Sequence, residues 1–392
     1  MWAELARLGR NAGTGGYRRY AWTGAEQDCR DWFRSEASAR GLDLDADGNG
    51  NEIAWWRPEP ATGRPVVTGS HLDSVPDGGA FDGPLGVVSG LAAVDLLRER
   101  GITPLSPIGV AVFCDEEGAR FGVACAGSRL LTGSLSADHA AALTDRDGMT
   151  LADAMRRAGF ADELGPSTLL RDPAAFVELH VEQGRALIEP IGIATAIWPH
   201  GRWRLDITGE GNHAGTTRLA DRRDPMLTYA ETVLAVRKKA GQAGALATFG
   251  RVEVAPGGSN AIPSEVRAWL DARAPDEATL ERLLAEITAH ATARAGRDGT
   301  DLSVTPESVS PAVYFGGPLF DRVRAVLPAA PVLPTGAGHD AGVLATAGIP
   351  TAMLFVRNPT GISHAPAEFA EPADCLAGVV ALADVLQELA CR

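Results

Sequence analysis

Short apolar runs along the chain alternate with longer segments that are rich in alanine and leucine at helical spacing. This alternation is typical of an α/β fold with a mainly parallel sheet. Four runs have the length and composition of buried strands: Pro65–Gly69, Ile108–Cys114, Ala175–Leu179 and Thr351–Val356. Each run leads into a segment that carries a histidine or a carboxylate. Because ligands of open α/β sheets bind beyond the carboxyl ends of the strands, we expect these polar side chains to meet at one edge.

The pattern changes between about Ala196 and Phe315. There the segments predict a strand, a helix, two strands, a helix and a strand, at Trp203–Thr208, Pro225–Lys239, Leu246–Val254, Val266–Ala272, Glu277–Ala295 and Leu302–Thr305. This order predicts a small α+β domain. Since residues suited to binding metals lie on both sides of it, we expect residues 196–315 to be inserted into a larger α/β domain made of residues 1–195 and 316–392.

Composition narrows the class of protein. The chain has 392 residues, and 45% of them are hydrophobic. This is enough apolar sequence for a large core, and the chain is longer than one domain usually requires. The formal net charge of -14 argues against a nucleic-acid-binding protein. Five cysteines without a C-x-x-C pair argue against a disulfide framework and favour a reducing compartment. No apolar leader and no stretch of membrane-spanning length is evident. We therefore expect a cytoplasmic protein that binds neither nucleic acid nor membrane.

Seven polar residues follow or end the expected strands: His71, Asp73, Asp82, Glu116, Glu117, His180 and His364. Imidazole and carboxylate ligands together suit zinc, manganese, cobalt or nickel. Five such ligands with one shared carboxylate suit two ions a few ångströms apart, as in two-metal hydrolysis.

Each of these positions also has an ordinary interpretation. A histidine at a strand end is often only a hydrogen-bonded polar residue, and we expect that of His139, His200 and His290. Asp82 alone would serve as a helix N-cap, and Glu116 with Glu117 as a solvated turn. When the residues are considered together, the ordinary interpretation is weak. Two adjacent acids after a buried strand repel each other unless cations bind them.

Several segments resemble the M20-type metallohydrolases, and within them the hydantoinase/carbamoylase branch of N-carbamoyl-L-amino acid amidohydrolases, allantoate amidohydrolases and β-ureidopropionases. The segments are GSHLDSVPDGGAFDGPLG, CDEEGARFG, ELHVEQG, GNHAGTTRLADRRD, NAIPSEVRAWLDAR, GAGHDA and GISHAPAE. They occur in family order from about Gly16 to Glu368. The E-Q-G after the histidine and the N-H-A-G-T-T are the features that resemble this branch more than the peptidases.

The resemblance implies two divalent ions per subunit (Mn, Zn, Co or Ni). The implied ligands are His71, Asp82 and His180 for one ion, and Asp82, Glu117 and His364 for the other, with Asp82 bridging. Glu116 would be the general base, and Asp73 would accept the remaining N–H of His71, which is the usual way to orient a ligating imidazole. The pair His339 and Asp340 would help to shape the floor of the site.

A carbamoyl amino acid presents a carboxylate, an amide N–H and a polarised carbonyl. Arg273 suits the carboxylate because a guanidinium binds it bidentately, Gln183 and Asn260 each donate and accept, and His213 can donate to a developing oxyanion. The resemblance assigns all four to substrate contact. It also implies a homodimer formed through a lid domain, residues 196–315, in which His213, Asn260 and Arg273 reach the partner's active site.

Two of these assignments have alternatives, and one position departs from the family. Arg273 could instead form a surface ion pair with Asp271 or Asp276, and His213 could be a turn residue between glycines. Where relatives usually carry Pro-Met after G-T-T, this chain has Arg218-Leu219. That departure affects the rim of the lid and weakens the substrate assignment.

The sequence thus predicts an amidohydrolase with two metal ions that cleaves the ureido C–N bond of an N-carbamoyl-L-amino acid. Allantoate and N-formyl or N-acyl amino acids are alternatives within the branch, and an aminoacylase or dipeptidase is the alternative within the class. A non-catalytic binding dimer is disfavoured because Glu116 and all five ligand positions are present. A serine or cysteine nucleophile is disfavoured because no G-x-S-x-G elbow is evident.

Overall fold

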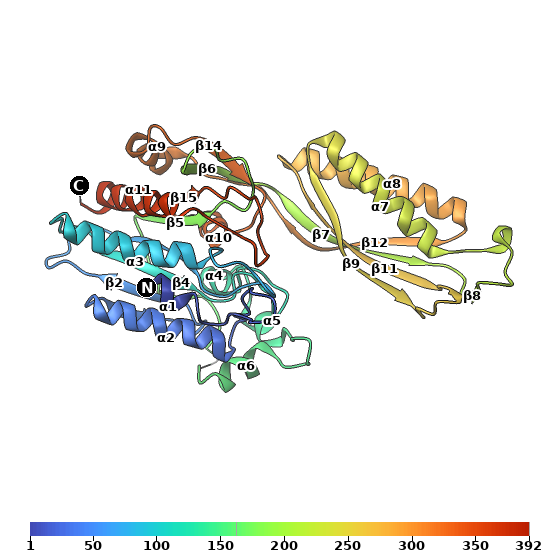
Figure 1. The fold of residues 1–392 in the computed structure, drawn as a ribbon, viewed down its shortest axis with the longest axis horizontal. Coiled ribbons are helices and arrows are strands. Elements are labelled where there is room, and N and C mark those ends of the chain that lie inside the picture. The colour runs from blue at the N-terminus through green and yellow to red at the C-terminus, as the bar shows by residue number, and fades with distance from the viewer. Residues whose placement is uncertain (162, 392) are drawn as a thin grey trace. The chain divides into compact units, whose positions relative to one another are not determined.

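The chain forms two compact units in the computed structural model, which describes residues 1–161 and 163–391. The larger unit comprises Met1–Ala196 and Tyr314–Arg392, and the smaller unit comprises Ile197–Val313 (Figure 1). An inserted unit was expected at 196–315. The assignment of these units as a catalytic domain and a lid remains a prediction.

The larger unit contains a nine-stranded mixed sheet. Its strands follow the spatial order β1-β2-β4-β3-β5-β15-β6-β13, and β14 also pairs with β6. The strands are β1 (Asp43–Ala46), β2 (Glu52–Trp56), β3 (Val66–His71), β4 (Ile108–Phe113), β5 (Ala175–Val181), β6 (Ile191–Ile197), β13 (Val313–Tyr314), β14 (Val332–Thr335) and β15 (Thr351–Val356).

The four apolar runs form the parallel centre of this sheet. β3 pairs in parallel with both β4 and β5, and β5 pairs in parallel with β15. Every residue of these four strands is buried, which explains why their sequences are continuously apolar rather than alternating. β2 and β6 flank the centre in antiparallel orientation. The expected α/β fold with a parallel core is therefore confirmed, within a sheet that is mixed as a whole.

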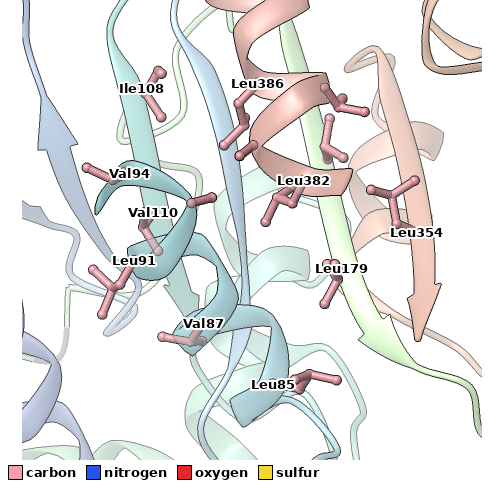
Figure 2. Close-up of a cluster of buried hydrophobic side chains, with 14 of the residues drawn as sticks. Leu85, Val87, Leu91, Val94, Ile108, Val110, Leu179, Leu354, Leu382 and Leu386 are labelled. Atoms are coloured by element: carbon pink, nitrogen blue, oxygen red, sulfur yellow. The ribbon is translucent and has the colours of Figure 1, made fainter. Parts of the chain in front are cut away.

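Long amphipathic helices bury one face of the sheet. The helices of this unit are α1 (Trp2–Leu5), α2 (Gly24–Ala39), α3 (Pro84–Glu99), α4 (Ala126–Thr132), α5 (Ala137–Ala142), α6 (Leu151–Arg157), α9 (Gly317–Val326), α10 (Asp340–Thr346) and α11 (Pro372–Ala390). Figure 2 shows α3 contributing Leu85 and Leu91, and α11 contributing Leu382 and Leu386, to a core over β4, β5 and β15. This packing stabilises the strands whose ends carry the site.

The smaller unit has the expected α+β composition. Its four-stranded antiparallel sheet has the order β12-β7-β11-β9. Its elements are β7 (His200–Thr208), β8 (Asn212–His213), the 3₁₀ turn η1 (Leu219–Asp221), α7 (Pro225–Ala243), β9 (Leu246–Ala255), β10 (Ala261–Ile262), β11 (Glu265–Arg273), α8 (Glu277–Asp298) and β12 (Asp301–Ser310). Buried positions alternate with partly buried or exposed ones along β7, and with partly buried ones along β11, and the buried residues pack with α7 and α8 in a separate core.

Two further observations bear on the sequence predictions. All five cysteines are free thiols in the structure, and Cys29, Cys114 and Cys125 are buried. Within the described ranges, no helix combines the length and apolar character that crossing a membrane requires.

Candidate metal and catalytic site

The predicted ligands gather where the central strands end. His71 is the last residue of β3 and His180 lies near the end of β5, whereas Glu116 and Glu117 follow β4. Asp82 lies in the loop between β3 and α3, and His364 lies in the loop between β15 and α11. Since the carboxyl ends of neighbouring parallel strands meet at one edge, residues far apart in sequence come together there.

One group of close donor atoms consists of His71, Asp82 and His180, all of them buried. Oδ1 of Asp82 lies 3.5 Å from Nε2 of His71 and 3.2 Å from Nε2 of His180. The N–H of Gly83 donates to the same His180 nitrogen at 3.3 Å. Gly83 has a φ of +83°, and a Cβ at this position would overlap the His71 ring. The glycine therefore allows the loop to bring Asp82 against both imidazoles.

A second group consists of Asp82, Glu117 and His364. Nε2 of His364 lies 3.3 Å from Oδ2 of Asp82 and 3.5 Å from Oε2 of Glu117. The two carboxylate oxygens of Asp82 thus face different groups. The structure brings together all five predicted ligands, in the two sets expected, with Asp82 common to both; their role as metal ligands remains a prediction.

Hydrogen bonds on the far side of the rings aim the imidazoles. Nδ1 of His180 lies 2.8 Å from the carbonyl oxygen of Val181, and Nδ1 of His71 lies 3.1 Å from that of Asp73. A carbonyl oxygen only accepts, so Nδ1 carries the proton in both contacts and the lone pair of Nε2 faces Asp82.

Asp73 makes more contacts than the sequence indicated. The side-chain Oδ1 of Asp73 lies 3.5 Å from Nδ1 of His71, whereas the backbone carbonyl oxygen of Asp73 lies closer to that nitrogen, at 3.1 Å. Its carboxylate accepts the backbone N–H groups of Glu116 and Glu117, both at 3.1 Å. Asp73 therefore ties the end of β3 to the turn after β4 and places both glutamates.

Glu116 is buried beside the first group and is not part of either set. Its Oε2 lies 3.7 Å from Nε2 of His71, and the thiol of Cys125 lies 3.5 Å from its Oε1. Burial raises the pKa of Glu116 well above its ordinary value; the charge of His71 opposes this effect, and the charges of Asp340 and Glu117 add to it. A carboxyl group with a raised pKa in this position can accept and return a proton.

The electrostatics of the two groups of donor atoms favour the binding of a cation. Burial and the charge of Asp82 raise the pKa of Glu117 to about 7. Partial burial lowers the pKa of His364, but its contacts with Asp82 and Glu117 outweigh this and raise it to about 9. Nε2 of His71 has no hydrogen-bond partner in the described part of the chain. Buried carboxylates facing imidazole lone pairs are a donor set that suits divalent transition metals, so the residues fit such an ion.

A third group of close donors lies behind the first: Glu178, His180 and His339. Both oxygens of Glu178 already accept hydrogen bonds, from the Ser70 hydroxyl at 2.8 Å and the Ala341 N–H at 3.0 Å. The buried ring of His339 lies 4.5 Å from that of His180, and burial lowers its pKa well below the ordinary value. A neutral His339 therefore packs behind His180, at the place where the sequence indicated a floor.

Sequence reasoning did not identify Glu178, Cys125, Ser363 or Glu368 as part of this region. The Ser363 hydroxyl donates to Oδ2 of Asp82 at 3.3 Å, and the Glu368 carboxylate accepts two N–H groups from the Asp82 loop. Glu178 had a sequence signal, because it is an acid inside the apolar run AFVEL. The contacts of the other three depend on tertiary packing alone.

The four predicted substrate residues are divided between the units. Gln183, in the larger unit, donates to Oδ2 of Asp82 and lies 3.3 Å from Nε2 of His364. In the smaller unit His213 and Asn260 are neighbours, because β8 pairs with β10 and the Ala214 N–H donates to the Asn260 carbonyl. His213 also accepts the Gly215 N–H at 3.0 Å, as a turn residue would.

Arg273 lies at the opposite end of the smaller sheet from His213 and Asn260. It is the last residue of β11 and pairs with His200, whereas the β8–β10 ribbon adjoins the end that begins at Glu265. The eight steps from Glu265 to Arg273 span roughly 26 Å. The expectation that all three residues reach the same partner site is therefore wrong, because a carbamoyl amino acid is far shorter than this separation.

Arg273 forms one of the two ion pairs considered as alternatives to substrate binding. Its Nε donates to Oδ1 of Asp271 at 2.9 Å, while Asp276 instead caps α8 through the Thr279 N–H. The departure at Arg218-Leu219 lies at the start of η1, where Arg218 forms an ion pair with Asp221 and Leu219 is 82% exposed.

Comparison with known proteins is consistent with this geometry. The model of peptidase family M20/M25/M40 matches residues 67–388. The chain is 36% identical to the N-carbamoyl-L-amino acid amidohydrolase of Geobacillus stearothermophilus, over 100% of this chain and 98% of that protein. It is 31% identical to the allantoate amidohydrolase of Bacillus subtilis, over 98% and 95%. A crystal structure of an amidase of the hydantoinase/carbamoylase family from Burkholderia vietnamiensis superposes with a TM-score of 0.90 at 32% identity, covering 100% and 96%.

Proposed function

We propose, from the premise that this chain belongs to peptidase family M20/M25/M40 and to its hydantoinase/carbamoylase branch, that it cleaves the ureido C–N bond of an N-carbamoyl-L-amino acid. The chain is a hydrolase of linear amide C–N bonds, of the carbamoylase and allantoate amidohydrolase type. The ureido substrate is supported by the relative with 36% identity. The observation that supports the mechanism best is the pair of donor sets that share Asp82 while Glu116 stays outside both.

The two donor sets would each hold one divalent ion, with His71 and His180 on one side of Asp82 and Glu117 and His364 on the other. Mn, Zn, Co and Ni all suit imidazole and carboxylate ligands. Bound ions would supply polarisation of the scissile carbonyl and would lower the pKa of the attacking water.

Glu116 would carry the proton through the reaction. It takes a proton from the water as the oxygen attacks the carbamoyl carbon, and it then returns a proton to the leaving nitrogen as the C–N bond breaks. The raised pKa of Glu116 supports this role, because a higher pKa makes the carboxylate a stronger base toward the attacking water.

The remaining predicted residues would recognise the substrate. Gln183 lies beside Asp82 and His364, where it can reach the ureido group. His213 and Asn260 form one pair of polar groups for the developing oxyanion, and Arg273 is a separate anchor for the carboxylate.

We also propose a homodimer through the lid, in which each active site draws on two lids. Within one lid the β8–β10 ribbon that carries His213 adjoins the start of β11, whereas Arg273 is the last residue of β11, so one substrate can meet both only if they come from different subunits. We therefore propose that a given active site receives Arg273 from one subunit and His213 with Asn260 from the other.

One release assay tests the function. Ammonia and amino acid release is measured with a panel of N-carbamoyl-L- and N-carbamoyl-D-amino acids, allantoate, N-formylglutamate and N-acetyl amino acids, with manganese, zinc or cobalt supplied. The proposal expects the highest kcat/KM for an N-carbamoyl-L-amino acid. Preference for allantoate would move the chain to the function of its 31% identical relative, and turnover of N-acetyl substrates alone would make it an aminoacylase. No turnover with any substrate and metal would support a non-catalytic dimer.

A further inference from the structure

Glu368 connects the two loops that carry the candidate ligands Asp82 and His364. It follows His364 by four residues in the segment before α11, and its side chain is buried. Its Oε2 accepts the backbone N–H of Phe81 at 2.8 Å and of Asp82 at 3.0 Å. One carboxylate oxygen thus holds two consecutive peptide groups of a loop that is distant in sequence.

The residue after Glu368 contacts the same loop. The ring of Phe369 packs edge-on against Phe81, with centroids 6.3 Å apart, and Trp2 stacks on Phe81 at 5.0 Å. Polar and apolar contacts therefore act on adjacent residues of both segments, which limits rotation about the backbone at Asp82. The two oxygens of Asp82 keep facing the two donor sets only if that backbone stays in place.

Gly79 shows how closely the loop encloses this carboxylate. A Cβ at Gly79 would overlap the side chain of Glu368 at its Cβ, Cδ and Oε2 atoms. Any larger residue at position 79 would have to displace Glu368. The Asp82 loop therefore packs against the Glu368 side chain at Gly79, in addition to the two hydrogen bonds at Phe81 and Asp82.

We propose that Glu368 is a positioning residue that fixes Asp82 between the two candidate metal sites, an inference that rests on the proposed two-metal function. It acts as a hydrogen-bond acceptor for the Phe81 and Asp82 N–H groups and does not contact the substrate. Groups that orient ligands from behind typically change metal affinity by about 10–100-fold when removed. The role needs an acceptor oxygen at this place rather than a negative charge.

The test compares two variants of similar side-chain length. Glu368→Gln keeps an oxygen acceptor, whereas Glu368→Met removes it. Metal-free full-length protein is titrated with Zn²⁺ or Mn²⁺ in competition with a chromophoric chelator, and kcat and KM are measured at limiting and at excess metal. We expect Glu368→Gln to bind metal within a few-fold of wild type. We expect Glu368→Met to bind at least one ion about 10–100-fold more weakly, with a reduced kcat at limiting metal, partial recovery in excess metal and little change in KM.

Gly79→Ala provides an independent route to the same defect, and Glu371→Met, which alters an exposed acid before α11, is the matched control. Gly79→Ala should weaken metal binding in the same direction and add little in combination with Glu368→Met, because both act on one contact. If Glu368→Met does not fold, the comparison of Gly79→Ala with Glu368→Gln takes its place.

Wild-type metal affinity in folded Glu368→Met, or in Gly79→Ala where that variant takes its place, overturns the inference. Equal losses of metal affinity in Glu368→Gln and Glu368→Met also overturn it. The negative charge of Glu368, and not its ability to accept hydrogen bonds, would then be the property that matters. These outcomes differ from failure of the proposed function, in which the wild-type chain itself would not hold two ions.

Discussion

The contacts of individual side chains divide the acids of the site into distinct roles. Asp82 faces three imidazoles. Burial alone would raise its pKa, but the nearby rings of His180, His364 and His71 favour the ionised carboxylate when they are protonated, and they hold its pKa well below the ordinary value. Glu116 has its pKa raised instead. Two carboxyl groups whose environments drive their pKa values apart are suited to different tasks, one to bind cations and one to move protons.

Replacing Glu116 by glutamine tests the proton-transfer role. The amide cannot accept a proton from water, so we expect kcat to fall by about 10²–10⁴-fold. Metal content and KM should stay near wild type, because Glu116 lies outside both donor sets. Steady-state kinetics with metal analysis on the same samples makes the measurement, and a kcat near wild type would remove Glu116 from this role.

The stability of the metal-free protein should fall as the pH rises from about 4.5 to about 9. The pKa of Glu117 is raised from 4.5 to about 7, and that of His364 from 6.5 to about 9. Both groups bind protons more tightly when folded, so the unfolded chain loses its protons first and folding becomes less favourable as pH rises. Calorimetry of the metal-free protein at several pH values measures this.

A bound cation replaces those protons, so the increase in Tm on adding metal should grow over the same pH range. An increase in Tm that is independent of pH between these limits would contradict the proposed environment of the two groups. His364→Gln and His139→Gln are a matched pair, because His139 is an exposed histidine of the larger unit outside the site. Only His364→Gln should reduce the pH dependence of the metal-induced increase in Tm.

At the level of elements, patterns of sufficient length predicted the architecture. The four buried runs became β3, β4, β5 and β15 because continuous apolar sequence requires cover on both faces of a sheet. The six inserted elements followed from alternating and helical periodicity. The β8–β10 ribbon was not predicted, since strands of two residues have no measurable period. The same limit applies to the loop contacts of Glu368 and Ser363, which depend on segments distant in sequence.

The entry into α3 provides a test at the same scale. Gly83 precedes the helix with a φ of +83°, and Gly101 follows it with a φ of +70°. An added Cβ would overlap the His71 ring at Gly83 but meets nothing within 4 Å at Gly101. Gly83→Ala should therefore weaken metal binding and lower kcat, whereas Gly101→Ala should cost only about 1 kcal/mol of stability through its backbone conformation. Metal titration and denaturant unfolding of both variants separate the two effects. Equal metal affinity in Gly83→Ala and wild type would argue against the close approach described here.

For the whole molecule, the two compact units each have a core of their own, and the candidate ligands all lie in the larger one. The family resemblance implied that His213, Asn260 and Arg273 of the smaller unit contact substrate, which stays a prediction. Only the strand pairing revealed that the β8–β10 ribbon with His213 adjoins one end of β11 while Arg273 lies at the other, because sequence motifs do not specify this pairing.

Mixing inactive variants tests the assignment of these residues to different subunits. An exchanged pair of His213→Ala and Glu116→Gln should regain activity up to the fraction set by random pairing if the partner supplies His213, because one site of each hybrid dimer is then intact. Arg273→Ala mixed with Glu116→Gln should stay inactive if Arg273 serves its own subunit. Exchange is verified with differently tagged chains. Recovery in both mixtures, or in neither, would refute this arrangement.

The central claim is that one chain holds two divalent ions through two donor sets that share Asp82. Elemental analysis of metal-free protein reconstituted with Zn²⁺ or Mn²⁺, performed alongside activity at each metal equivalent, tests it most directly. Our account predicts two ions per chain, activity that depends on the second ion, and loss of both sites in Asp82→Ala. A single tight ion that supports full activity, with no further activation by a second equivalent, would contradict it.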